Sequence, residues 1–287
     1  MKILFIGASG MLGKPVAKEL IRAGFECSLL GRNAIKLKSI FPDTTIITGD
    51  ILDLPSLTSA MKGMDAVYCN LSVLQNSREK DPQPEREGLD NILTAAKENG
   101  INRIAYISSL VHRYEGMNGF SWWAFRIKQQ AVKKIKASGI PYTIFYPSTF
   151  METYPYQMMR GNKIAVLGRS IAPMWFIAAA DFAKQVSHSF QKPGTDNREY
   201  TIQGPEAYTF EEANKIFISH YTKKKLGMMK APMWLVKFLG NFVPKFNYGW
   251  HICEALNKYP EQFESANTWE ELGKPEITLA VYAASHP

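Results

Sequence analysis

The chain has 287 residues, of which 46% are hydrophobic and 21% are charged, and its formal net charge is +8. These proportions are typical of a globular protein and exclude a disordered, collagen-like or coiled-coil chain. Apolar runs such as residues 3–6 are too short to cross a membrane, and the first residues lack the apolar region and the cleavage site of a signal peptide. We therefore expect a cytoplasmic protein that contacts no membrane.

The positive charge is uneven, because residues 1–150 hold 19 basic and 13 acidic residues whereas residues 151–287 hold 15 and 13. The first half therefore favours an anion. From composition alone, that anion is a nucleic acid, a membrane surface or a phosphorylated cofactor.

The cysteines and the later histidines give no sign of a metal site. Cys27, Cys69 and Cys253 have no C-x-x-C spacing, so we expect buried thiols without a disulfide. No metal-ligand spacing relates the histidines at positions 188, 220, 251 and 286. We expect no metal.

Short runs rich in β-branched or aromatic residues recur along the first half of the chain. They cover residues 2–6, 26–31, 44–48, 65–70, 103–108 and 142–146. Apolar residues at helical spacing follow Gly10 as far as Gly24, and also predict helices over 85–99 and 121–138. Apolar strands that alternate with helices are typical of a parallel sheet covered on both faces. The sequence thus predicts an α/β fold with a Rossmann-type, doubly wound parallel sheet over residues 1–150.

The alternation weakens after residue 150, which predicts a smaller C-terminal substrate lobe over residues 151–287, with about 180–203 returning to the main sheet. Asp181 is expected to cap a helix, residues 198–202 to form a strand, and Thr209 with Glu212 to form a capping box. An apolar stripe after Pro232 is interpreted as core of this lobe rather than a membrane anchor. It comprises Trp234, Leu235, Phe238, Leu239 and Phe242.

The sequence IGASGMLG places Gly7, Gly10 and Gly13 at the first turn from strand to helix. Glycine there permits a tight turn and lets backbone N–H groups approach a pyrophosphate at the helix N-terminus. The spacing is G-x-x-G-x-x-G rather than the G-x-G-x-x-G of the dinucleotide fingerprint. With a strand before it and a helix after it, the motif favours dinucleotide binding over a purely structural turn.

The second predicted strand ends at Gly31 and Arg32, about 20 residues beyond Gly13, where an acidic residue binds the free ribose hydroxyl of NAD. An arginine at this position accommodates the additional phosphate of NADP. The alternative is a solvated surface arginine. Because no acidic residue ends this strand, NADP(H) is the predicted cofactor, with Lys36 one helical turn further on.

Several segments together carry a family resemblance: GASGMLG at the first turn, GDILD over 49–53, YISS over 106–109, the block from Lys128 to Phe150 that contains GIPYTIFYPSTF, and LGKPEITLAVYAA over 272–284. The whole chain resembles the NmrA-like atypical short-chain dehydrogenase/reductases, in the branch of isoflavone reductase and phenylcoumaran benzylic ether reductase. The resemblance implies that Asp50 lies beside the adenine and that residues 70–72 flank the cofactor. Asp50 and Ser72 are alternatively turn or cap residues. The full set expected to bind cofactor is Gly7, Ser9, Gly10, Met11, Leu12, Gly13, Arg32, Lys36, Asp50, Ile51, Asn70, Leu71, Ser72, Lys128, Tyr146 and Pro147.

Short-chain dehydrogenases usually carry a proton-donating tyrosine four residues before an active-site lysine, whereas position 124 here is alanine. The resemblance implies that Lys128 alone acts as acid or base, or orients the nicotinamide ribose. The alternative is one more solvated lysine on a basic helix. Ser109 and Tyr114 are the other expected catalytic residues, although a serine at a strand end also caps turns and a loop tyrosine also packs.

The expected substrate pocket contains Ser108, His112, Phe150 and Met151, and further aromatic and methionine residues suit it as well. These are Tyr154, Met158, Met174 and Trp175. The sequence therefore predicts an NADPH-dependent reductase of a small apolar or aromatic acceptor, present as a monomer or homodimer. One alternative is an NADP(H)-binding redox sensor without turnover. The other is a nucleic-acid-binding protein, suggested by the mixed basic and aromatic residues 122–136, but core packing explains the spacing of these residues.

Overall fold

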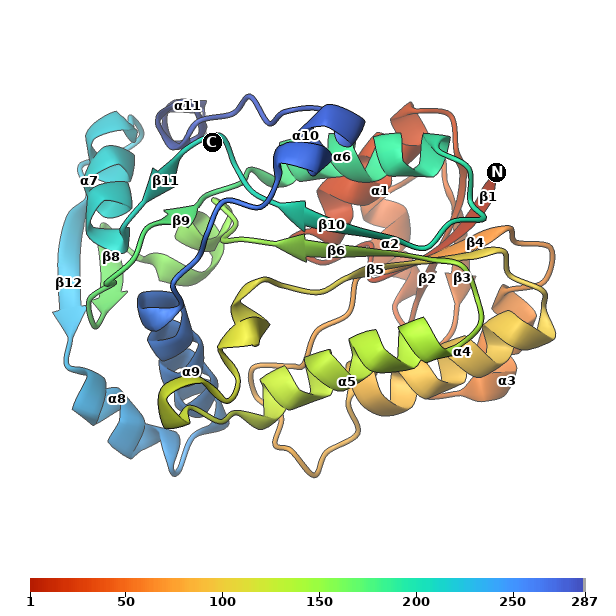
Figure 1. Ribbon diagram of the computed structural model, residues 1–287, viewed down its shortest axis with the longest axis horizontal. Helices are drawn as coiled ribbons and strands as arrows, with labels where there is room; N and C mark the ends of the chain where they lie inside the picture. The colour runs from red at the N-terminus through yellow and green to blue at the C-terminus, as the bar shows by residue number, and fades with distance from the viewer. Residues whose placement is uncertain (286–287) are drawn as a thin grey trace.

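Seven parallel strands form the central sheet of the computed structural model, which describes residues 1–285 (Figure 1). Their spatial order is β10-β6-β5-β4-β1-β2-β3. The strands are β1 (Lys2–Ile6), β2 (Glu26–Gly31), β3 (Thr45–Thr48), β4 (Ala66–Cys69), β5 (Arg103–Ile107), β6 (Tyr142–Pro147) and β10 (Arg198–Ile202). The Rossmann-type fold predicted from the sequence is confirmed. One of the histidines without metal-ligand spacing, at position 286, lies outside the described residues.

Three helices cover each face of this sheet, above and below it in Figure 1. One face carries α1 (Gly13–Arg22), α2 (Ala34–Ile40) and α6 (Ala179–Gln191). The other carries α3 (Leu54–Ala60), α4 (Leu89–Glu98) and α5 (Trp123–Ala137). Each face buries its own apolar cluster, so the strands are apolar on both sides, as parallel sheets require.

The helix predicted over residues 85–99 begins one residue earlier, as a single π-helical turn, η1 (Pro84–Gly88), that runs directly into α4. Short π-helical turns are frequent at functional sites because they re-aim a side chain. Here the turn buries Glu85, whose exposed fraction is 1%.

The rest of the chain forms what we call the C-terminal lobe, residues 151–178 and 203–285. It contains two small sheets, five helices and one short helical turn, η4 (Tyr154–Met158). Two further short turns, η2 (Val111–Tyr114) and η3 (Met117–Gly119), lie outside the lobe, between β5 and α5. The strands are β7 (Met159–Arg160), β8 (Lys163–Leu167), β9 (Met174–Trp175), β11 (Ala207–Tyr208) and β12 (Gly227–Ala231). The helices are α7 (Phe210–His220), α8 (Met233–Gly240), α9 (Pro244–Lys258), α10 (Ala266–Leu272) and α11 (Leu279–Ser285).

Three expectations for the second half need correction. Asp181 is not a helix cap, because α6 begins at Ala179 and the Asp181 carboxylate accepts the backbone N–H groups of Glu276 and Ile277. The apolar stripe after Pro232 is not core: Trp234 is 70% exposed and Phe238 57%. Met151, Tyr154 and Met174 do not line a substrate pocket as expected, because they are buried in the apolar core of the C-terminal lobe. The capping box of Thr209 with Glu212 is present as predicted.

Candidate functional site

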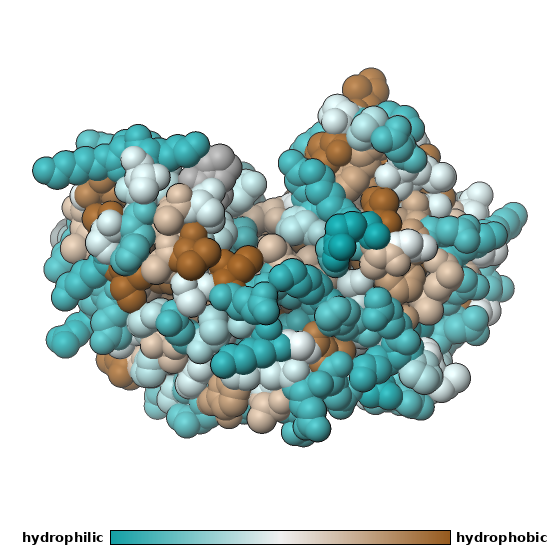
Figure 2. Space-filling view, turned by 90° about the horizontal axis from the view of Figure 1, so that it is seen from above, coloured by the Kyte–Doolittle hydropathy of each residue, from teal (hydrophilic) through white to brown (hydrophobic). Residues whose placement is uncertain are grey.

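A cavity of about 1140 Å³ lies at the carboxyl edge of the parallel sheet. Residues that follow β1 to β6 line it, together with side chains of α5 and α9. This is the edge at which doubly wound sheets bind ligands, next to the point where the strand order reverses between β1 and β4. Seen from above in Figure 2, the surface is hollowed between the C-terminal lobe on the left and the sheet domain on the right.

The glycine turn between β1 and α1 is closely packed. Gly7 has a φ of +88°, and a Cβ atom there would lie 2.4 Å from the carbonyl oxygen of Asn70. A Cβ atom on Gly13 would lie 2.0 Å from the carbonyl oxygen of Gly7, so both positions exclude any side chain. The Asn70 amide donates a hydrogen bond of 3.2 Å to that same carbonyl and joins the turn to the end of β4.

This turn fits a pyrophosphate. Helix α1 begins at Gly13, directly after this turn, and its N-terminus carries the positive end of the helix dipole. Residues 7–12 line the cavity, whereas Gly13 lies behind them, at the contact between helix and turn. The donor set and the space left by absent side chains are those a dinucleotide needs.

Arg32 and Lys36 line the cavity beyond the end of β2. Both side chains are exposed, and neither forms an ion pair within residues 1–285. Asn33 caps α2 by accepting the Lys36 backbone N–H at 2.8 Å, which holds the start of this helix beside Arg32. Two unpaired cations at this strand end suit a phosphate group.

The residues after β3 and β4 line the next part of the wall. Asp50, Ile51, Asn70, Leu71 and Ser72 all contact the cavity, as the resemblance implied. The Asp50 carboxylate accepts the Leu52 N–H at 3.0 Å, so it also forms the turn that the alternative interpretation describes.

Lys128, Glu85 and Tyr106 form a polar cluster at the inner end of the cavity. The Lys128 ammonium lies 2.5 Å from Oε1 of Glu85 and 3.5 Å from the Tyr106 hydroxyl, which donates to the same carboxylate oxygen. The Lys128 side chain is only 14% exposed, and that of Glu85 is fully buried. Burial, and then the charge of Glu85, hold the pKa of Tyr106 well above its usual value, so this hydroxyl remains a donor. Lys128 is therefore a positioned cation rather than a freely solvated one.

The structure brings some of the other expected residues to the cavity and not others. Ser108, Ser109, Pro147 and Phe150 line it. Three others do not: Tyr114 is fully buried against Phe120, Met151 lies in the lobe core, and Tyr146 turns its hydroxyl to Glu199 at 2.7 Å.

His112 also lies behind the wall, where its Nδ1 shares a hydrogen bond of 3.1 Å with the Ser108 hydroxyl. Burial, followed by the charges of Lys128 and Arg113, lowers its pKa to about 3. The imidazole is thus neutral at physiological pH and orients Ser108.

Glu85 and Tyr248 are among the polar cavity residues that were missed from the sequence. Glu85 is the first residue of the helix predicted over 85–99, and charged residues are seldom buried. Tyr248 comes from α9, far along the chain, and burial together with the charge of Glu85 raises its pKa to about 12. No local sequence pattern predicts that either residue lines the cavity. Their place becomes evident only in the folded structure, where Lys128 lies on the same wall.

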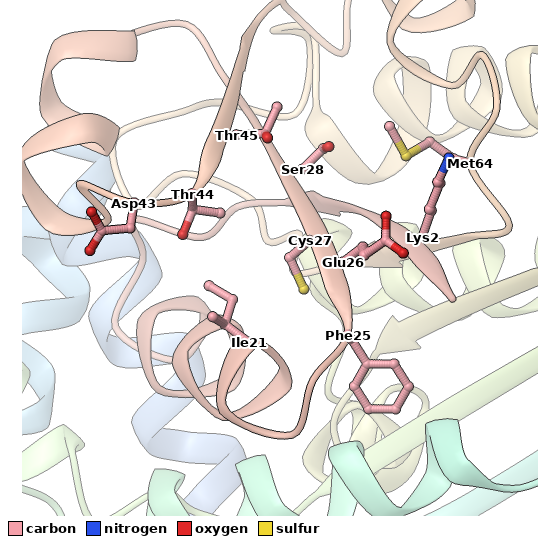
Figure 3. Close-up of a pocket in the computed structure, with 10 residues that line it drawn as sticks. All are labelled: Lys2, Ile21, Phe25, Glu26, Cys27, Ser28, Asp43, Thr44, Thr45 and Met64. Atoms are coloured by element: carbon pink, nitrogen blue, oxygen red, sulfur yellow. The ribbon is translucent and has the colours of Figure 1, made fainter.

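Figure 3 shows a second, smaller pocket of about 430 Å³ at the opposite, amino-terminal edge of β1, β2 and β3. It is lined by Lys2, Ile21, Phe25, Glu26, Cys27, Ser28, Asp43, Thr44, Thr45 and Met64. Burial raises the pKa of the Cys27 thiol to about 12, so this pocket offers no activated nucleophile. Nowhere in residues 1–285 do three or more His, Cys, Asp or Glu side chains gather as a metal site would require.

Comparison with known proteins places the chain in a family. The model of the NAD(P)H-binding family matches residues 7–192, so the chain belongs to that family. A similar protein is the (4-alkanoyl-5-oxo-2,5-dihydrofuran-3-yl)methyl phosphate reductase of Streptomyces griseus, 28% identical over 213 residues that cover 73% of this chain and 70% of that one. The phenylcoumaran benzylic ether reductase PT1 of Pinus taeda is 26% identical over 227 residues, 71% of this chain and 69% of its own. The resemblance drawn from the sequence motifs is confirmed.

The fold is also that of a solved structure, the NADPH-dependent quinone oxidoreductase of Escherichia coli in complex with NADPH. The TM-score is 0.76 at 20% identity, over 98% of each chain. Over residues 1–285, none of the helices has the length and apolar character needed to cross a bilayer.

Proposed function

We propose that the protein is an NADPH-dependent reductase of a small apolar or aromatic acceptor. The observation that carries the proposal is that one cavity joins the glycine turn, the cations after β2 and the Lys128 cluster. Its volume exceeds the roughly 300–1000 Å³ typical of a site for one drug-sized ligand, which accords with a cofactor and a second molecule together. The reductases among its relatives support the same class of reaction.

The chain's own residues define where the cofactor binds. Backbone N–H groups of Ser9, Met11 and Leu12 hold the pyrophosphate, because the Gly10 N–H already donates to the Gly7 carbonyl. Arg32 and Lys36 bind the 2′-phosphate, and Asp50 and Ile51 lie along the adenosine half. Asn70, Leu71 and Ser72 follow towards the nicotinamide half, where Lys128 and Pro147 line the wall. When bound, NADPH supplies a hydride to the acceptor.

Lys128 holds the proton that the reduced acceptor takes up. Its ammonium has three donors, and Glu85 together with the Tyr106 hydroxyl fixes its position. Glu85 is a positioning residue, because its Oε1 receives both Lys128 and Tyr106. Ala124 lines the cavity four residues before Lys128, so the tyrosine usual in short-chain dehydrogenases has no counterpart there. The hydroxyl of Ser109 lies on the same wall, available to a carbonyl oxygen.

The remaining wall is apolar and selects the acceptor. Its side chains come from the loop after β4, from α5 and from α9. They include Val73, Leu74, Trp122, Phe125, Phe150, Tyr248 and Ile252. Such a wall favours an aromatic or apolar molecule over a sugar or an amino acid. We extend the proposal to the division of the chain, with residues 1–150 holding the cofactor and the C-terminal lobe completing the acceptor pocket.

The experiment is a fluorescence titration with NADPH, followed by a screen of quinones, enones, aldehydes and aryl ethers for NADPH oxidation. Turnover of one class supports the reductase. Tight NADPH binding without turnover of any class supports the second candidate, a redox sensor, which the absence of a tyrosine at position 124 favours.

A further inference from the structure

The exposed apolar side chains of this protein are concentrated in one short segment. Of the sixteen large hydrophobic residues exposed in residues 1–285, eight lie between positions 228 and 246. We call these eight the apolar rim: Met228, Met229, Trp234, Leu235, Phe238, Phe242, Val243 and Phe246. Soluble monomers rarely leave so many large apolar groups together in water, which indicates an interaction surface.

The rim residues lie on consecutive elements of the chain, from β12 to the start of α9. Strand β12 is the edge strand of its small sheet, pairing only with β8, and it leads directly into α8. Both elements form the outer boundary of the C-terminal lobe, at the left of Figure 1. Trp234 and Phe238 are one helical turn apart, and the rings of Phe238 and Phe242 lie 5.5 Å from each other. The aromatic side chains thus form one row along α8 and the turn that follows it.

The chain segment that carries the rim has charged side chains of a single sign. Residues 213–253 contain seven lysines and no aspartate, glutamate or arginine. They are Lys215, Lys223, Lys224, Lys225, Lys230, Lys237 and Lys245. Among these, within the described structure, Lys237 alone forms an ion pair, 2.6 Å from Glu254 of α9. This segment therefore carries a charge of +7 in a chain whose total is +8.

We propose that the apolar rim and its lysines dock the protein onto an anionic lipid bilayer. Aromatic and methionine side chains enter the boundary between headgroups and acyl chains, while lysines bind anionic headgroups. A second copy of the chain is a poor occupant, because a symmetric dimer through this face would bring the two lysine clusters together. The sequence-based expectation of no membrane contact treated the stripe as core, and its exposure removes that reason.

Docking would also bring the bilayer close to the cavity. Helix α8 packs along α9, and Tyr248 and Ile252 of α9 line the cavity wall. An apolar acceptor dissolved in the bilayer would then have a short path to Lys128. The docking itself does not rest on the proposed reductase function.

The first test is flotation of the full chain with phosphatidylcholine vesicles, with and without phosphatidylglycerol. We expect binding to the anionic vesicles, at least tenfold weaker binding to the neutral ones, and loss of most binding near 1 M salt, where the Debye length falls to about 3 Å. Equal binding to both vesicle types, or none to either, overturns the proposal.

The second test uses two variants with matched controls. Trp234→Ser with Phe238→Ser removes aromatic groups from the rim, and Val281→Ser removes one exposed apolar side chain from α11. Lys223→Glu with Lys224→Glu and Lys225→Glu reverses charge beside the rim, and Lys62→Glu with Lys97→Glu reverses exposed charges on the sheet domain. Both rim variants should lose vesicle binding at least tenfold, and both controls should retain it.

Two further measurements distinguish loss of membrane docking from misfolding of a variant and from dimerisation of the chain. Unchanged NADPH affinity shows that a rim variant is folded, and it separates failure of the docking from failure of the reductase proposal. Sedimentation velocity of the wild type without lipid should give a monomer. A dimer that the aromatic variant dissociates, together with no vesicle binding, would assign the rim to a second copy instead.

Discussion

The sheet domain and the C-terminal lobe bury their polar groups in different ways. In the sheet domain, two apolar clusters sandwich the strands, and the polar backbone is satisfied by the ladder of parallel strands. The lobe has one smaller apolar cluster of its own and shares another, through α9, with α5, and buried carboxylates also hold it to the sheet domain. Both carboxylate oxygens of Glu152 accept the Ala179 N–H at 3.0 Å, and the Glu261 carboxylate accepts the Ser148 hydroxyl at 2.7 Å.

This difference separates two tasks of the molecule. The sheet domain supplies a rigid edge where the glycine turn, Arg32 and Lys128 keep fixed positions. The lobe supplies an apolar wall through α9 and an exposed rim through α8. Changes in the first region should therefore affect cofactor binding and chemistry, and changes along the carboxylate contacts should affect stability and its pH dependence.

Gly10→Val should abolish detectable NADPH binding while the fold survives. A Cβ atom at this position would lie 3.3 Å from the Gly7 carbonyl oxygen and the Asn70 amide, which is tight but tolerable, whereas the valine methyl groups would occupy the turn surface that lines the cavity. Fluorescence titration measures binding, and circular dichroism measures the fold. Gly227→Val, in open space on β12, is the control and should bind NADPH normally. Unaltered affinity in Gly10→Val would remove the pyrophosphate site from this turn.

Lys128→Met should lower kcat at saturating NADPH by about 10²–10⁴-fold, the usual cost of losing a positioned acid or base. Lys133→Met is the matched control, since that lysine is exposed on the same helix. Steady-state kinetics with the acceptor found in the screen gives both values. A normal kcat in Lys128→Met would make this residue structural only.

Glu85→Gln sharpens the same test. If Glu85 positions Lys128, the variant should keep its NADPH affinity, lose less of kcat than Lys128→Met does, and shift the pH profile of kcat. An unchanged pH profile alongside a lower melting temperature would show that Glu85 stabilises the fold without tuning the lysine.

Arg32→Ala should erase most of the preference for NADPH over NADH. A charged hydrogen bond contributes about 1.5–3 kcal/mol, so the wild type should prefer NADPH by about 10- to 150-fold at low salt. Dissociation constants for both cofactors, in the wild type, in Arg32→Ala and in the distant control Lys97→Ala, measure the ratio. We expect the variant to weaken NADPH and leave NADH nearly unchanged. A wild-type ratio near one would leave Arg32 as a surface residue.

The same contrast explains what the sequence could predict. The strands of the central sheet, the glycine turn and Arg32 follow from patterns within a few residues, and the strands lie close to their predicted positions. Lys128 follows from the family resemblance, and it lines the cavity together with the glycine turn and Arg32. Glu85 could not be predicted, because its burial depends on Tyr106 and Lys128, which are 21 and 43 residues away in the chain. A charged residue at the start of a helix is ordinarily assigned to solvent.

The two errors about apolar residues have a related cause. Periodicity shows that a helix has an apolar face, but it does not show what covers that face. The stripe of α8 is therefore exposed although it was expected to be core, and Tyr114 is packed, the alternative to its expected catalytic role. Both outcomes are decided by contacts between distant segments of the chain.

The smallest expected effect concerns Glu261, which links the lobe to the sheet domain. Burial raises its pKa from the usual 4.5 to about 7, while hydrogen bonds from Gln203 and Ser148 oppose the rise. The folded protein therefore binds more protons at this site than the unfolded chain between about pH 4.5 and 7. The contribution of Glu261 to stability is present below pH 4.5 and is lost as the pH rises through 7, by at most about 3 kcal/mol.

Glu261→Gln should remove this pH dependence. The glutamine carbonyl can accept the Gln203 amide, and its own amide can donate to the Ser148 hydroxyl oxygen, which reverses the direction of that hydrogen bond. Relative to the wild type, the variant should gain free energy of unfolding as the pH rises from 5 to 8, measured by urea denaturation at each pH. Because His112 and the other titrating groups are common to both proteins, their effects cancel in the difference. Glu206→Gln, in the loop before β11 where the carboxylate accepts the Tyr208 hydroxyl within the lobe, is the control for replacing a hydrogen-bonded glutamate by glutamine. A difference for Glu261→Gln that does not vary with pH would show that this carboxylate is already ionised when buried, held by its hydrogen bonds rather than by its proton.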